Sequence, residues 1–439
     1  MKIAVIGIGY VGLVTSSCFA ESGFDVISMD INEEKINMLK NGQVPFYEPG
    51  LSEIVKRNYS NGRLEFTTDC KYAVENATII FIAVDTPSNQ EGNADVSQVL
   101  AVVNSIGEYI NGYKIIVTKS TVPVGTGHKI KEVLHDVLSK RGETYNFDVV
   151  SNPEFLREGS SVYDFMNPER VIVGADNINE NDNIKNIFKE LYNKNNCSFV
   201  FTNIETSEII KYACNSFLAV KVAFINEIAN LSEAVGVNVK DVAVGMGLDS
   251  RIGGKYLNAG PGYGGNCLPK DTKALVHIGN EHGVDMSIIK TVIKSNNLQK
   301  NRIAKKIEMV LGGVCGKNIA LLGLSFKADT DDLRESVAIV IINELIKKGA
   351  IVKVFDPVAI SSAKKCLVDQ ENIYFARDEY DAIANADAIV IATEWKQFCE
   401  IDYIAAKNQL RRNVIFDLKN LLDKTKLLNI GYEYHGIGI

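Results

Sequence analysis

The opening of the chain, Lys2-Ile-Ala-Val-Ile-Gly-Ile-Gly-Tyr-Val-Gly12, is an apolar run that leads into the pattern G-x-G-x-x-G. Residues 3–8 predict a buried strand, and residues 12–22 predict the helix that follows it. In such a turn the first glycine permits a tight bend, the second lets a pyrophosphate approach the backbone, and the third allows close helix–strand packing. The helix N-terminus adds partial positive charge toward the phosphates. The stretch therefore predicts a dinucleotide site on an α/β sheet.

An acidic residue follows at the distance that such a site requires. Residues 26–29 predict the second strand, and Asp30 ends it, 18 residues beyond Gly12. A carboxylate there can accept hydrogen bonds from both ribose hydroxyls and repels a 2′-phosphate, which favours NAD over NADP. From the sequence alone, Lys35 is read as a solvated side chain rather than as a contact of the adenosine.

Apolar runs that alternate with helical stretches continue along the first half of the chain. Alternation of this kind implies a parallel sheet with helices on both faces, because each parallel crossover places a helix against the sheet. The expected strands are 78–84, 114–118 and 148–151, and the expected helices lie around 96–110 and 129–139.

The last third of the chain repeats the opening in a weaker form. Residues 317–324 echo residues 2–8, and residues 351–356 echo residues 25–30, which predicts a second doubly wound domain. Gly323 stands there without the two following glycines. This domain is therefore expected to bind something other than a dinucleotide, or to bind it differently. Its further expected strands are 388–392 and 414–417.

The middle of the chain has a helical pattern. Apolar residues recur close to the 3.6-residue period over residues 205–247, which predicts a long helix, and shorter helices are expected to about residue 300. Such a helix can bridge two domains and can also support a dimer. The apolar positions are Ile209, Ala213, Phe217, Val220, Phe224, Ile228 and Leu231.

Composition limits the classes of function. A chain of 439 residues suggests two or three domains, and 46% hydrophobic residues with only 9 prolines exclude the compositions of disordered and collagenous chains. The net charge of −7 argues against bulk electrostatic binding to nucleic acid or to an anionic membrane, although a local basic pocket stays open. No run reaches the roughly 18 apolar residues that span a bilayer. We expect neither nucleic acid nor membrane among the partners.

The N-terminal stretch, the cysteines and the histidines bear on the cellular compartment of the protein and on whether it holds a metal. The apolar stretch 3–14 after Lys2 resembles a signal peptide, but the dinucleotide motif accounts for the same residues better and continues to Asp30. The 8 cysteines are dispersed without a C-x-x-C pair, which predicts reduced thiols and a cytoplasmic location. The 5 histidines show no ligand spacing, so no metal is expected.

One cysteine stands apart from the others. Cys267 lies in the stretch Pro261-Gly-Tyr-Gly-Gly-Asn-Cys-Leu-Pro-Lys-Asp271, a glycine-rich loop without apolar periodicity, so packing does not explain it. Lys270 can favour the thiolate and Asp271 can move protons, which makes Cys267 a candidate nucleophile. Cys18 and Cys214, on predicted helices, read as small buried hydrophobes.

Acidic and amide side chains form a third set of candidates. Glu154 and Glu158 follow a predicted strand, at the carboxyl edge where open α/β sheets bind ligands, and they share a face if the chain turns helical after Pro153. A solvated helix start explains them equally well. Lys211 and Asn215 are four residues apart on the long helix and project from one face. Lys211 can stabilise an oxyanion if it is buried, whereas a solvated lysine is the simpler reading.

Two further segments follow strands. Thr121 lies just past the strand 114–118, where an ordinary turn would also explain it. Lys327 and Arg334 follow the first strand of the second domain, where a basic residue can hold a diphosphate in place of the absent glycines.

Taken together, these segments resemble the UDP-glucose 6-dehydrogenase family, within the nucleotide-sugar dehydrogenases, from residue 1 to about residue 420. The resemblance implies NAD-dependent, four-electron oxidation of UDP-glucose to UDP-glucuronate by a cytoplasmic homodimer. It also implies an α/β fold with two doubly wound Rossmann-like domains joined by a long central helix. The expected division is 1–203 for the NAD-binding domain, 204–300 for the helical dimerisation region and 301–439 for the UDP-sugar-binding domain.

The family's chemistry implies a role for each candidate. Cys267 would hold the aldehyde-level intermediate as a thiohemiacetal, which a second oxidation converts to a thioester that water hydrolyses. Lys211 would stabilise the oxyanion. The remaining roles are proton transfer by Asp271 and by a water that Thr121 holds, general base catalysis of hydrolysis by Glu154, and orientation of the intermediate by Asn215.

The resemblance also implies two sets of binding residues. Arg251 would reach in from a neighbouring subunit. The NAD set is Gly7, Gly9, Tyr10, Val11, Gly12, Asp30, Lys35, Thr86, Thr121, Glu158, Lys270 and Arg334. The nucleotide-sugar set is Glu154, Phe155, Leu156, Arg157, Glu158, Lys211, Asn215, Arg251, Tyr256, Leu257, Asn258, Ala259, Gly260, Gly264 and Lys327.

Departures from the family pattern leave the substrate open. Asp85 stands where proline is common, and Lys419 stands where the family often has arginine, so that bidentate geometry is lost. The substrate is therefore UDP-glucose or else GDP-mannose or a UDP-N-acetylhexosamine. A two-electron dehydrogenase of the 6-phosphogluconate type, which needs no cysteine, also stays open, as does a non-catalytic nucleotide sensor or scaffold. Fold alone does not decide among these functions.

Overall fold

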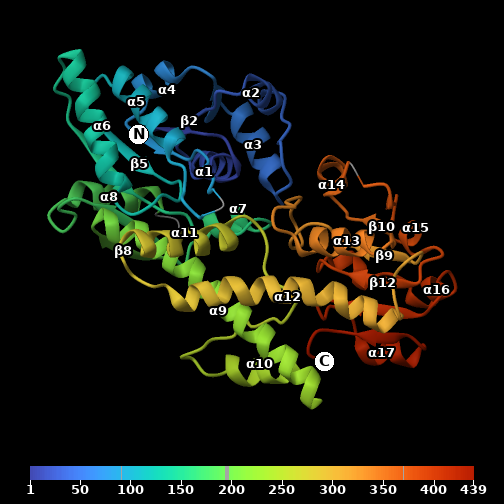
Figure 1. Cartoon of the computed structure of the whole chain (residues 1–439). Helices are drawn as coiled ribbons and strands as arrows, with labels where there is room; N and C mark the ends of the chain where they lie inside the picture. The colour runs from blue at the N-terminus through green and yellow to red at the C-terminus, as the bar shows by residue number, and fades with distance from the viewer. Residues whose placement is uncertain (90, 193–196, 369) are drawn as a thin grey trace. The chain divides into compact units, whose positions relative to one another are not determined.

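The glycine-rich turn lies at the centre of a parallel sheet. The computed structural model describes residues 1–89, 91–192, 197–368 and 370–439, and the chain divides into two compact units. The first unit comprises residues 1–214 and 277–282, and the second comprises residues 215–276 and 283–439. Figure 1 follows the chain from the N-terminal strands in blue to the C-terminal strands in red.

The first unit contains an eight-stranded sheet with the order β3-β2-β1-β4-β5-β6-β7-β8. Neighbouring strands are parallel except at β6 and β7, where the pairing is antiparallel. The strands are β1 (Lys2–Ile6), β2 (Asp25–Met29), β3 (Leu64–Thr67), β4 (Ile79–Ile82), β5 (Lys114–Thr118), β6 (Phe147–Ser151), β7 (Arg170–Ala175) and β8 (Ser198–Thr202).

Helices cover both faces of this sheet, as the alternating apolar runs predicted. On β1, Ile3 and Val5 face a core shared with α1, α3, α7 and α8, whereas Ala4 and Ile6 face a core shared with α4, α5 and α6. Figure 1 shows α5 and α6 side by side. These helices are α1 (Tyr10–Glu21), α2 (Glu33–Lys40), α3 (Leu51–Ser60), α4 (Cys70–Asn76), α5 (Ser97–Tyr109), α6 (Thr126–Arg141), α7 (Ser161–Met166) and α8 (Asp182–Leu191).

The second unit repeats the architecture with a six-stranded parallel sheet. Its order is β11-β10-β9-β12-β13-β14, which matches β3-β2-β1-β4-β5-β6 of the first sheet position by position. The predicted internal repeat is therefore confirmed in the topology. The strands are β9 (Asn318–Leu322), β10 (Ile351–Phe355), β11 (Ile373–Phe375), β12 (Ala388–Ile391), β13 (Val414–Asp417) and β14 (Glu433–His435).

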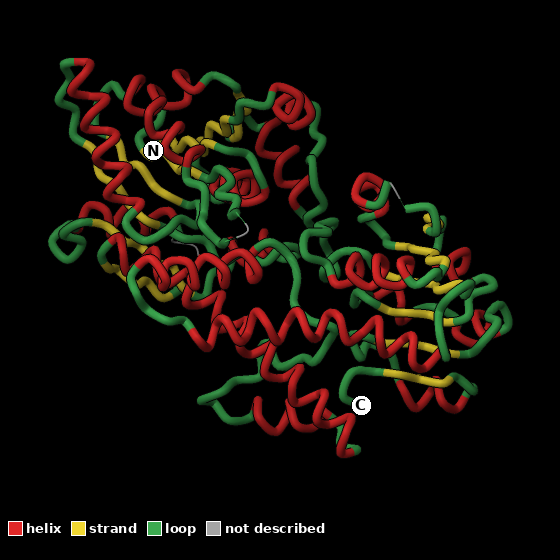
Figure 2. Tube along the Cα trace, viewed as in Figure 1, coloured by secondary structure: helices red, strands yellow, loops and turns green. Residues whose placement is uncertain are grey.

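Short helices and loops alternate with these strands, as Figure 2 shows in red and green. The cores again lie on both faces: Ile319 and Leu321 of β9 face one, and Ala320 and Leu322 face the other. The helices after β9 are α13 (Val337–Lys347), α14 (Ile360–Cys366), α15 (Glu379–Ile383), the 3₁₀ helix η1 (Lys396–Cys399), α16 (Tyr403–Lys407) and α17 (Lys424–Asn429).

The central helices differ from the prediction of one long helix over 205–247. Helix α9 (Ile204–Val235) ends where Gly236 takes a left-handed φ of +76°, and α10 (Val239–Gly247) begins after the Asn238 side chain caps Lys240 N. Helix α12 (Ser287–Leu311) is 25 residues long and passes residue 300. The remaining helix is α11 (Cys267–Glu281). The boundary between the compact units falls within α9 and within α11. Among the described helices, none has the length and hydropathy of a membrane span.

Candidate active site

The glycines of the turn between β1 and α1 differ in how much space surrounds the position of a Cβ. A Cβ on Gly12 would lie 1.8 Å from Gly7 O, so only glycine lets α1 pack this closely on the strand. Gly9 is different, since its Cβ would meet only Asp85 Oδ1 at 3.7 Å. The backbone in front of Gly9 is therefore open to a ligand at the N-terminus of α1.

Asp30 lies beside this turn, at the end of β2. Its carboxylate accepts hydrogen bonds from Ile8 N at 2.8 Å, Asn32 N at 3.0 Å and Lys35 Nζ at 2.9 Å. Burial opposes ionisation of Asp30, but these donors outweigh it and hold the pKa of Asp30 below its usual range. The solvated reading of Lys35 is wrong, because its ammonium pairs with Asp30. An open turn beside an ionised carboxylate fits an NAD pyrophosphate and ribose.

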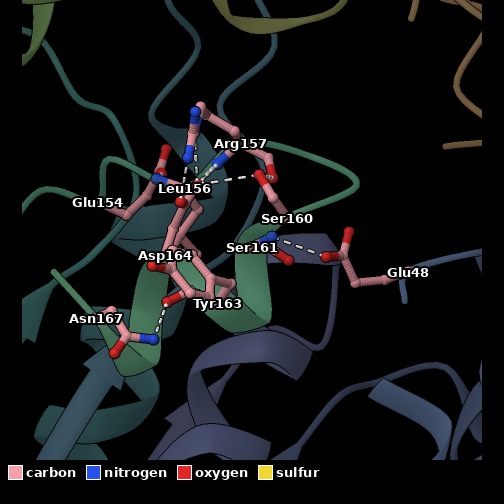
Figure 3. A network of polar contacts seen from close by, with 9 residues as sticks. All are labelled: Glu48, Glu154, Leu156, Arg157, Ser160, Ser161, Tyr163, Asp164 and Asn167. Atoms are coloured by element: carbon pink, nitrogen blue, oxygen red, sulfur yellow. Dashed lines mark hydrogen bonds and ion pairs between the residues drawn. The ribbon is translucent and has the colours of Figure 1, made fainter. Parts of the chain in front are cut away.

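Glu48, which the sequence did not single out, connects the glycine turn to the loop before α7. Its buried carboxylate accepts hydrogen bonds from Gly159 N at 2.6 Å, Ser161 N at 2.8 Å and the Tyr10 hydroxyl. Figure 3 shows Glu48 pointing at the start of α7. Burial and the contact with Glu48 raise the pKa of Tyr10. No local sequence signal marks Glu48, because its partners lie 38 to 113 residues away.

The segment after β6 is not helical, so the shared face proposed for Glu154 and Glu158 does not form. Glu154 Oε2 instead accepts Leu156 N at 2.5 Å, and Glu154 Oε1 lies 2.9 Å from Lys211 Nζ. Lys211 also donates to Glu154 O at 2.6 Å, and only 3% of its side chain is exposed. The solvated reading of Lys211 is therefore wrong. Burial opposes ionisation of Glu154, but Lys211 together with the Leu156 N–H group and Lys119 outweighs it, so the pKa of Glu154 is lowered.

Aromatic and basic side chains extend this segment. The Arg170 guanidinium lies 4.2 Å from the centre of the Phe155 ring, and Lys211 Nζ lies 5.3 Å from it. Arg157 forms a bidentate pair with Asp164 of α7, through Nε at 2.9 Å and Nη2 at 2.6 Å, as Figure 3 shows. The guanidinium thus has a carboxylate counterion in this structure.

A second buried lysine lies near the pair of Glu154 and Lys211. Lys119, the residue after β5, donates from Nζ to Asn152 Oδ1 at 2.9 Å and to the Tyr192 hydroxyl at 3.1 Å. Its burial lowers the pKa of the Lys119 ammonium to about 7. Sequence reasoning missed Lys119, although its position just past a strand, two residues before Thr121, was a usable signal.

Thr121 itself is positioned by contacts on both sides. The Thr86 hydroxyl donates to Thr121 O at 2.7 Å. Farther along the same loop, Glu208 of α9 accepts Gly125 N at 2.7 Å and Gly127 N at 2.9 Å, at the N-terminus of α6. Burial raises the pKa of Glu208 to about 7. The loop that carries Thr121 is thus fixed to α9 through a buried carboxylate.

In the second unit, Cys267 is the first residue of α11 rather than part of the preceding loop. A helix N-terminus favours a thiolate. One turn later Asp271, 1% exposed, accepts Asn215 Nδ2 at 2.6 Å and lies 3.0 Å from Lys270 Nζ. The structure therefore brings Asn215, Lys270 and Asp271 together at the start of this helix.

Close packing explains the glycines that precede Cys267. A Cβ on Gly264 would lie 2.4 Å from Glu335 O, and Gly265, with φ of +79°, donates to Arg334 O at 2.9 Å. The guanidinium of Arg334 forms a bidentate pair with Asp332. Lys327 lies past β9, with Nζ 5.6 Å from the Phe326 ring centre.

The predicted sugar loop 256–260 is held from both sides. Gly260 N donates to Asn226 Oδ1 at 2.8 Å, and Gln299 Nε2 donates to Gly260 O at 2.9 Å. Leu257 and Ala259 are buried, Asn258 is exposed, and Tyr256 has a left-handed φ of +66°. Arg251 is exposed and pairs with Asp249. Lys419, past β13, forms an ion pair with Glu394 Oε2 at 2.8 Å.

The candidate site residues are divided between the two compact units. Among the described residues, no group of three or more His, Cys, Asp or Glu side chains is arranged to hold a metal ion. In the first unit lie Gly7, Gly9, Tyr10, Val11, Gly12, Asp30, Lys35, Thr86, Thr121, Glu154, Phe155, Leu156, Arg157, Glu158 and Lys211. In the second lie Asn215, Arg251, Tyr256, Leu257, Asn258, Ala259, Gly260, Gly264, Cys267, Lys270, Asp271, Lys327 and Arg334.

Comparison with family models gives three consecutive matches. They are to the UDP-glucose/GDP-mannose dehydrogenase family: its NAD binding domain over residues 1–194, its central domain over residues 205–298, and its UDP binding domain over residues 320–424. The matches cover most of the chain in the order of the elements described above.

Individual relatives agree over the whole length. The chain is 46% identical over 437 residues to UDP-glucose 6-dehydrogenase TuaD of Bacillus subtilis, covering 100% of this chain and 93% of the relative. It is 45% identical over 443 residues to UDP-glucose 6-dehydrogenase of Rhizobium meliloti, covering 100% and 99%. The solved structure of a UDP-glucose dehydrogenase from Pyrobaculum islandicum matches with a TM-score of 0.90 at 34% identity, covering 100% of this chain and 97% of that one.

Proposed function

The chain belongs to the UDP-glucose/GDP-mannose dehydrogenase family, and we propose that it oxidises C6 of UDP-glucose to the carboxylate of UDP-glucuronate. It is an NAD-dependent oxidoreductase, and its substrate is a nucleotide sugar. The observation that carries the proposed four-electron chemistry is Cys267 at the start of α11, one turn before a buried Asp271 that Asn215 and Lys270 hold.

The first unit would bind the cofactor. Bound NAD supplies the two-electron acceptor for each of the two oxidations. We assign its pyrophosphate to the open backbone at Gly9, Tyr10 and Val11, where the N-terminus of α1 favours negative charge. Asp30 would accept from the ribose hydroxyls, and its ionised carboxylate favours NAD over NADP. The remaining proposed contacts in this unit are Gly7, Gly12, Lys35, Thr86, Thr121 and Glu158, and the second unit would contribute Lys270 and Arg334.

The alcohol step removes a proton from the C6 hydroxyl. We assign that proton transfer to Asp271 and to a water held by Thr121. Asp271 is suited to this role because its position is fixed by the amide of Asn215 and by Lys270. The product of this step is an aldehyde.

The thiol step makes a covalent intermediate. Sγ of Cys267 adds to the aldehyde carbon and forms a thiohemiacetal, and the second oxidation converts that carbon to a thioester. Lys211, whose Nζ pairs with Glu154 Oε1, would stabilise the oxyanion. Glu154 would then remove a proton from the water that attacks the thioester, so that the acid leaves and the thiol of Cys267 returns.

The second sheet would hold the nucleotide part of the substrate. Lys327 and Lys419 each follow a strand of this sheet, at the carboxyl edge where such sheets bind ligands. The ion pair of Lys419 with Glu394 places a cation there although the arginine of the family pattern is absent. We assign the sugar to residues 154–158 and 256–260, with Gly264 close to the reacting end.

We also propose a homodimer in the cytoplasm, divided at residues 203 and 300 into NAD-binding, dimerisation and UDP-sugar-binding regions. The dimer is supported by a stripe on α9 at seven-residue spacing: Phe217 is 63% exposed, Phe224 47% and Leu231 57%. Arg251, exposed on the same unit, would reach the partner's substrate. The cytoplasmic location is supported by 8 cysteines that are all free thiols.

The test counts NADH formed per sugar consumed. Purified protein receives excess NAD and limiting UDP-glucose, and parallel reactions receive GDP-mannose or UDP-GlcNAc. We expect two NADH per UDP-glucose and almost none from the other sugars. One NADH per sugar would mean release of the aldehyde and would contradict the thioester; two NADH from another sugar alone would keep the chemistry and change the substrate.

A matched pair of variants isolates the thiol. We expect Cys267→Ser to abolish formation of UDP-glucuronate, because a serine hydroxyl cannot form the thioester. Cys315→Ser, at an exposed cysteine, should leave the stoichiometry at two NADH. Full activity of Cys267→Ser would favour a two-electron dehydrogenase that needs no cysteine, and absence of NADH with every sugar would favour a non-catalytic protein.

A further inference from the structure

Lys300 is a buried lysine of α12 that the mechanism above does not use. Only 5% of the residue is exposed, and its Nζ donates to Glu335 O at 3.1 Å and to Glu335 Oε2 at 3.0 Å. Removing an ammonium from water is costly unless it finds acceptors, so Lys300 depends on these two. Since one acceptor is a backbone carbonyl, Lys300 fixes the main chain at Glu335 as well as its side chain.

Glu335 lies in a turn that is packed against two glycines. A Cβ on Gly264 would lie 2.4 Å from Glu335 O, so the two backbones are in contact. The preceding residue of the turn, Arg334, accepts Gly265 N through its O atom at 2.9 Å. Glu335 has a left-handed φ of +53°, which is uncommon for a residue with a Cβ and persists only where the surroundings hold it. The turn is thus held by Lys300 on one side and in contact with the glycines on the other.

These glycines lead directly to the proposed nucleophile. Cys267 begins α11 two residues after Gly265. The Glu335 carboxylate reaches this helix too, because its Oε1 lies 3.5 Å from Lys273 Nζ. Burial opposes ionisation of Glu335, but Lys300 and Lys273 outweigh it and lower its pKa, so the carboxylate stays charged. Glu335 therefore connects α12 to the start of the helix that carries the thiol.

Amide side chains on the same face of α12 hold the earlier part of this loop. Asn296, one turn before Lys300, accepts Tyr263 N at 2.8 Å through Oδ1 and donates from Nδ2 to Tyr263 O at 3.1 Å. Gln299 donates from Nε2 to Gly260 O at 2.9 Å. Both amides are 4% exposed, and buried polar groups whose hydrogen bonds are satisfied rigidify the segment that they contact.

We propose that Lys300 is a positioning residue, which holds Cys267 at the start of α11 through Glu335 and the glycines beside it. When Lys300 is removed, the turn at residues 334–335 loosens, and the thiol is in place for attack only part of the time. The addition of Sγ to the aldehyde suffers, because reacting atoms must lie about 3 to 3.5 Å apart. The first oxidation suffers less, since Asn215 of α9 holds Asp271. The inference rests on the proposed function, in which Cys267 is the nucleophile.

The same helix offers a matched control. Lys306 of α12 also donates from Nζ to one backbone carbonyl and one glutamate, Gly436 O and Glu233 Oε1, each at 2.7 Å. Lys300→Met and Lys306→Met therefore remove the same kinds of contact at two places. The contacts of Lys300 lead to Cys267, whereas those of Lys306 lead to the segment after β14 and to α9.

The activity experiment measures kcat and the NADH formed per sugar consumed. The full-length protein receives excess NAD and limiting UDP-glucose, or the nucleotide sugar that proves to be oxidised. We expect Lys300→Met to lower kcat for acid formation at least about tenfold, and to yield fewer than two NADH per sugar because aldehyde escapes before the thiol attacks. Lys306→Met should keep two NADH per sugar, with kcat changed less than about twofold.

The yield separates positioning from support of the fold. A variant that is only partly folded has a lower kcat, but each molecule that remains folded still forms two NADH per sugar. Glu335→Gln keeps the shape of the side chain and removes its charge, so it serves as a second variant if Lys300→Met does not fold. We expect its yield to fall below two NADH as well.

Hydrogen exchange tests the position of the loop without a substrate. Mass spectrometry follows the amides of residues 260–267, among them Gly265 N, which donates to Arg334 O. We expect this segment to exchange at least about tenfold faster in Lys300→Met than in the wild type, because a lost hydrogen bond to an ammonium makes local opening easier. Its exchange in Lys306→Met should match the wild type.

Three outcomes overturn the inference. A yield of two NADH per sugar from Lys300→Met would mean that Lys300 only supports the fold. Equal exchange of residues 260–267 in Lys300→Met and the wild type, or the same losses in Lys306→Met, would mean that Lys300 does not hold this loop. In each case two NADH from the wild type would still support the proposed function, so the two failures are distinct. If the wild type oxidises no sugar, the proposed function fails, and hydrogen exchange then decides whether Lys300 positions the segment that ends at Cys267.

Discussion

At the scale of single residues, Glu208 shows how burial changes the behaviour of a carboxylate. It accepts the backbone N–H groups of Gly125 and Gly127, yet burial dominates and raises its pKa to about 7. Glu205, three residues earlier on α9, has the opposite shift: a backbone hydrogen bond dominates and lowers its pKa. Two glutamates one turn apart thus respond to pH with opposite signs.

This contrast gives a prediction for stability. Folded Glu208 binds a proton between about pH 4.5 and pH 7 that the unfolded chain has released, so the wild type loses stability relative to Glu208→Gln as the pH rises through this window. The full change is about 3 kcal/mol. Glu205→Gln is the control, and there the wild type should gain stability as the pH rises toward 4.5. Urea unfolding at a series of pH values measures both, and a flat difference for Glu208→Gln would contradict the burial argument.

At the scale of elements, the turn into α1 separates two uses of glycine. Gly12 is required by packing, because its Cβ would lie 1.8 Å from Gly7 O, whereas Gly9 has room for a Cβ. The same motif thus contains a position that packing restricts to glycine and a position, Gly9, that we assign to the cofactor.

Alanine at each position should reveal the difference. We expect Gly12→Ala to destabilise the protein by about 2 to 4 kcal/mol, because the strand and helix must move apart. Gly9→Ala should cost less than about 1 kcal/mol, yet it should weaken NAD binding at least tenfold, since the methyl group occupies the space of the pyrophosphate. Thermal unfolding and calorimetric titration with NAD test the pair. Normal NAD binding by a folded Gly9→Ala would contradict the assigned cofactor site.

The strands were predictable because each one is a short apolar run bounded by polar residues. The predicted strand 114–118 coincides with β5, and the limits of most others differ by one or two residues. The break after Val235 was missed because the apolar period continues into α10, and a single Gly236 was outweighed by that pattern. The hydrogen-bond and ion-pair partners of individual side chains were harder to predict than the strands and helices. Lys211 meets Glu154 across 57 residues and Lys119 meets Tyr192 across 73, and local periodicity carries no information on such partners.

At the scale of the whole molecule, the exposed apolar stripe on α9 bears on whether two copies of the chain form a dimer. Apolar side chains at Phe217, Phe224 and Leu231 are exposed at seven-residue spacing along this one helix. A solvent-exposed apolar helix surface of this kind is stabilised when a second copy of the chain covers it.

A charged substitution in the middle of the stripe should separate the copies. We expect Phe224→Asp to raise the dimer dissociation constant at least about a hundredfold, because a buried unpaired carboxylate is strongly unfavourable at an interface. Light scattering after size-exclusion chromatography measures the mass. Ile404→Asp, at another exposed apolar residue, is the control and should leave the mass unchanged. A wild-type monomer, or a Phe224→Asp dimer of unchanged affinity, would contradict the assignment of this surface.

The two sheets share one more detail, the acidic residue that ends the second strand of each. Asp356 follows β10 as Asp30 follows β2, and it accepts Leu324 N at 2.7 Å as Asp30 accepts Ile8 N at 2.8 Å. In the second sheet, however, the same carboxylate also accepts Ser325 N and Trp395 Nε1, and Ser325 stands where Gly9 stands in the first sheet. The bond that closes the turn is therefore present in both sheets, whereas the backbone that Gly9 leaves open in the first sheet carries the side chain of Ser325 in the second.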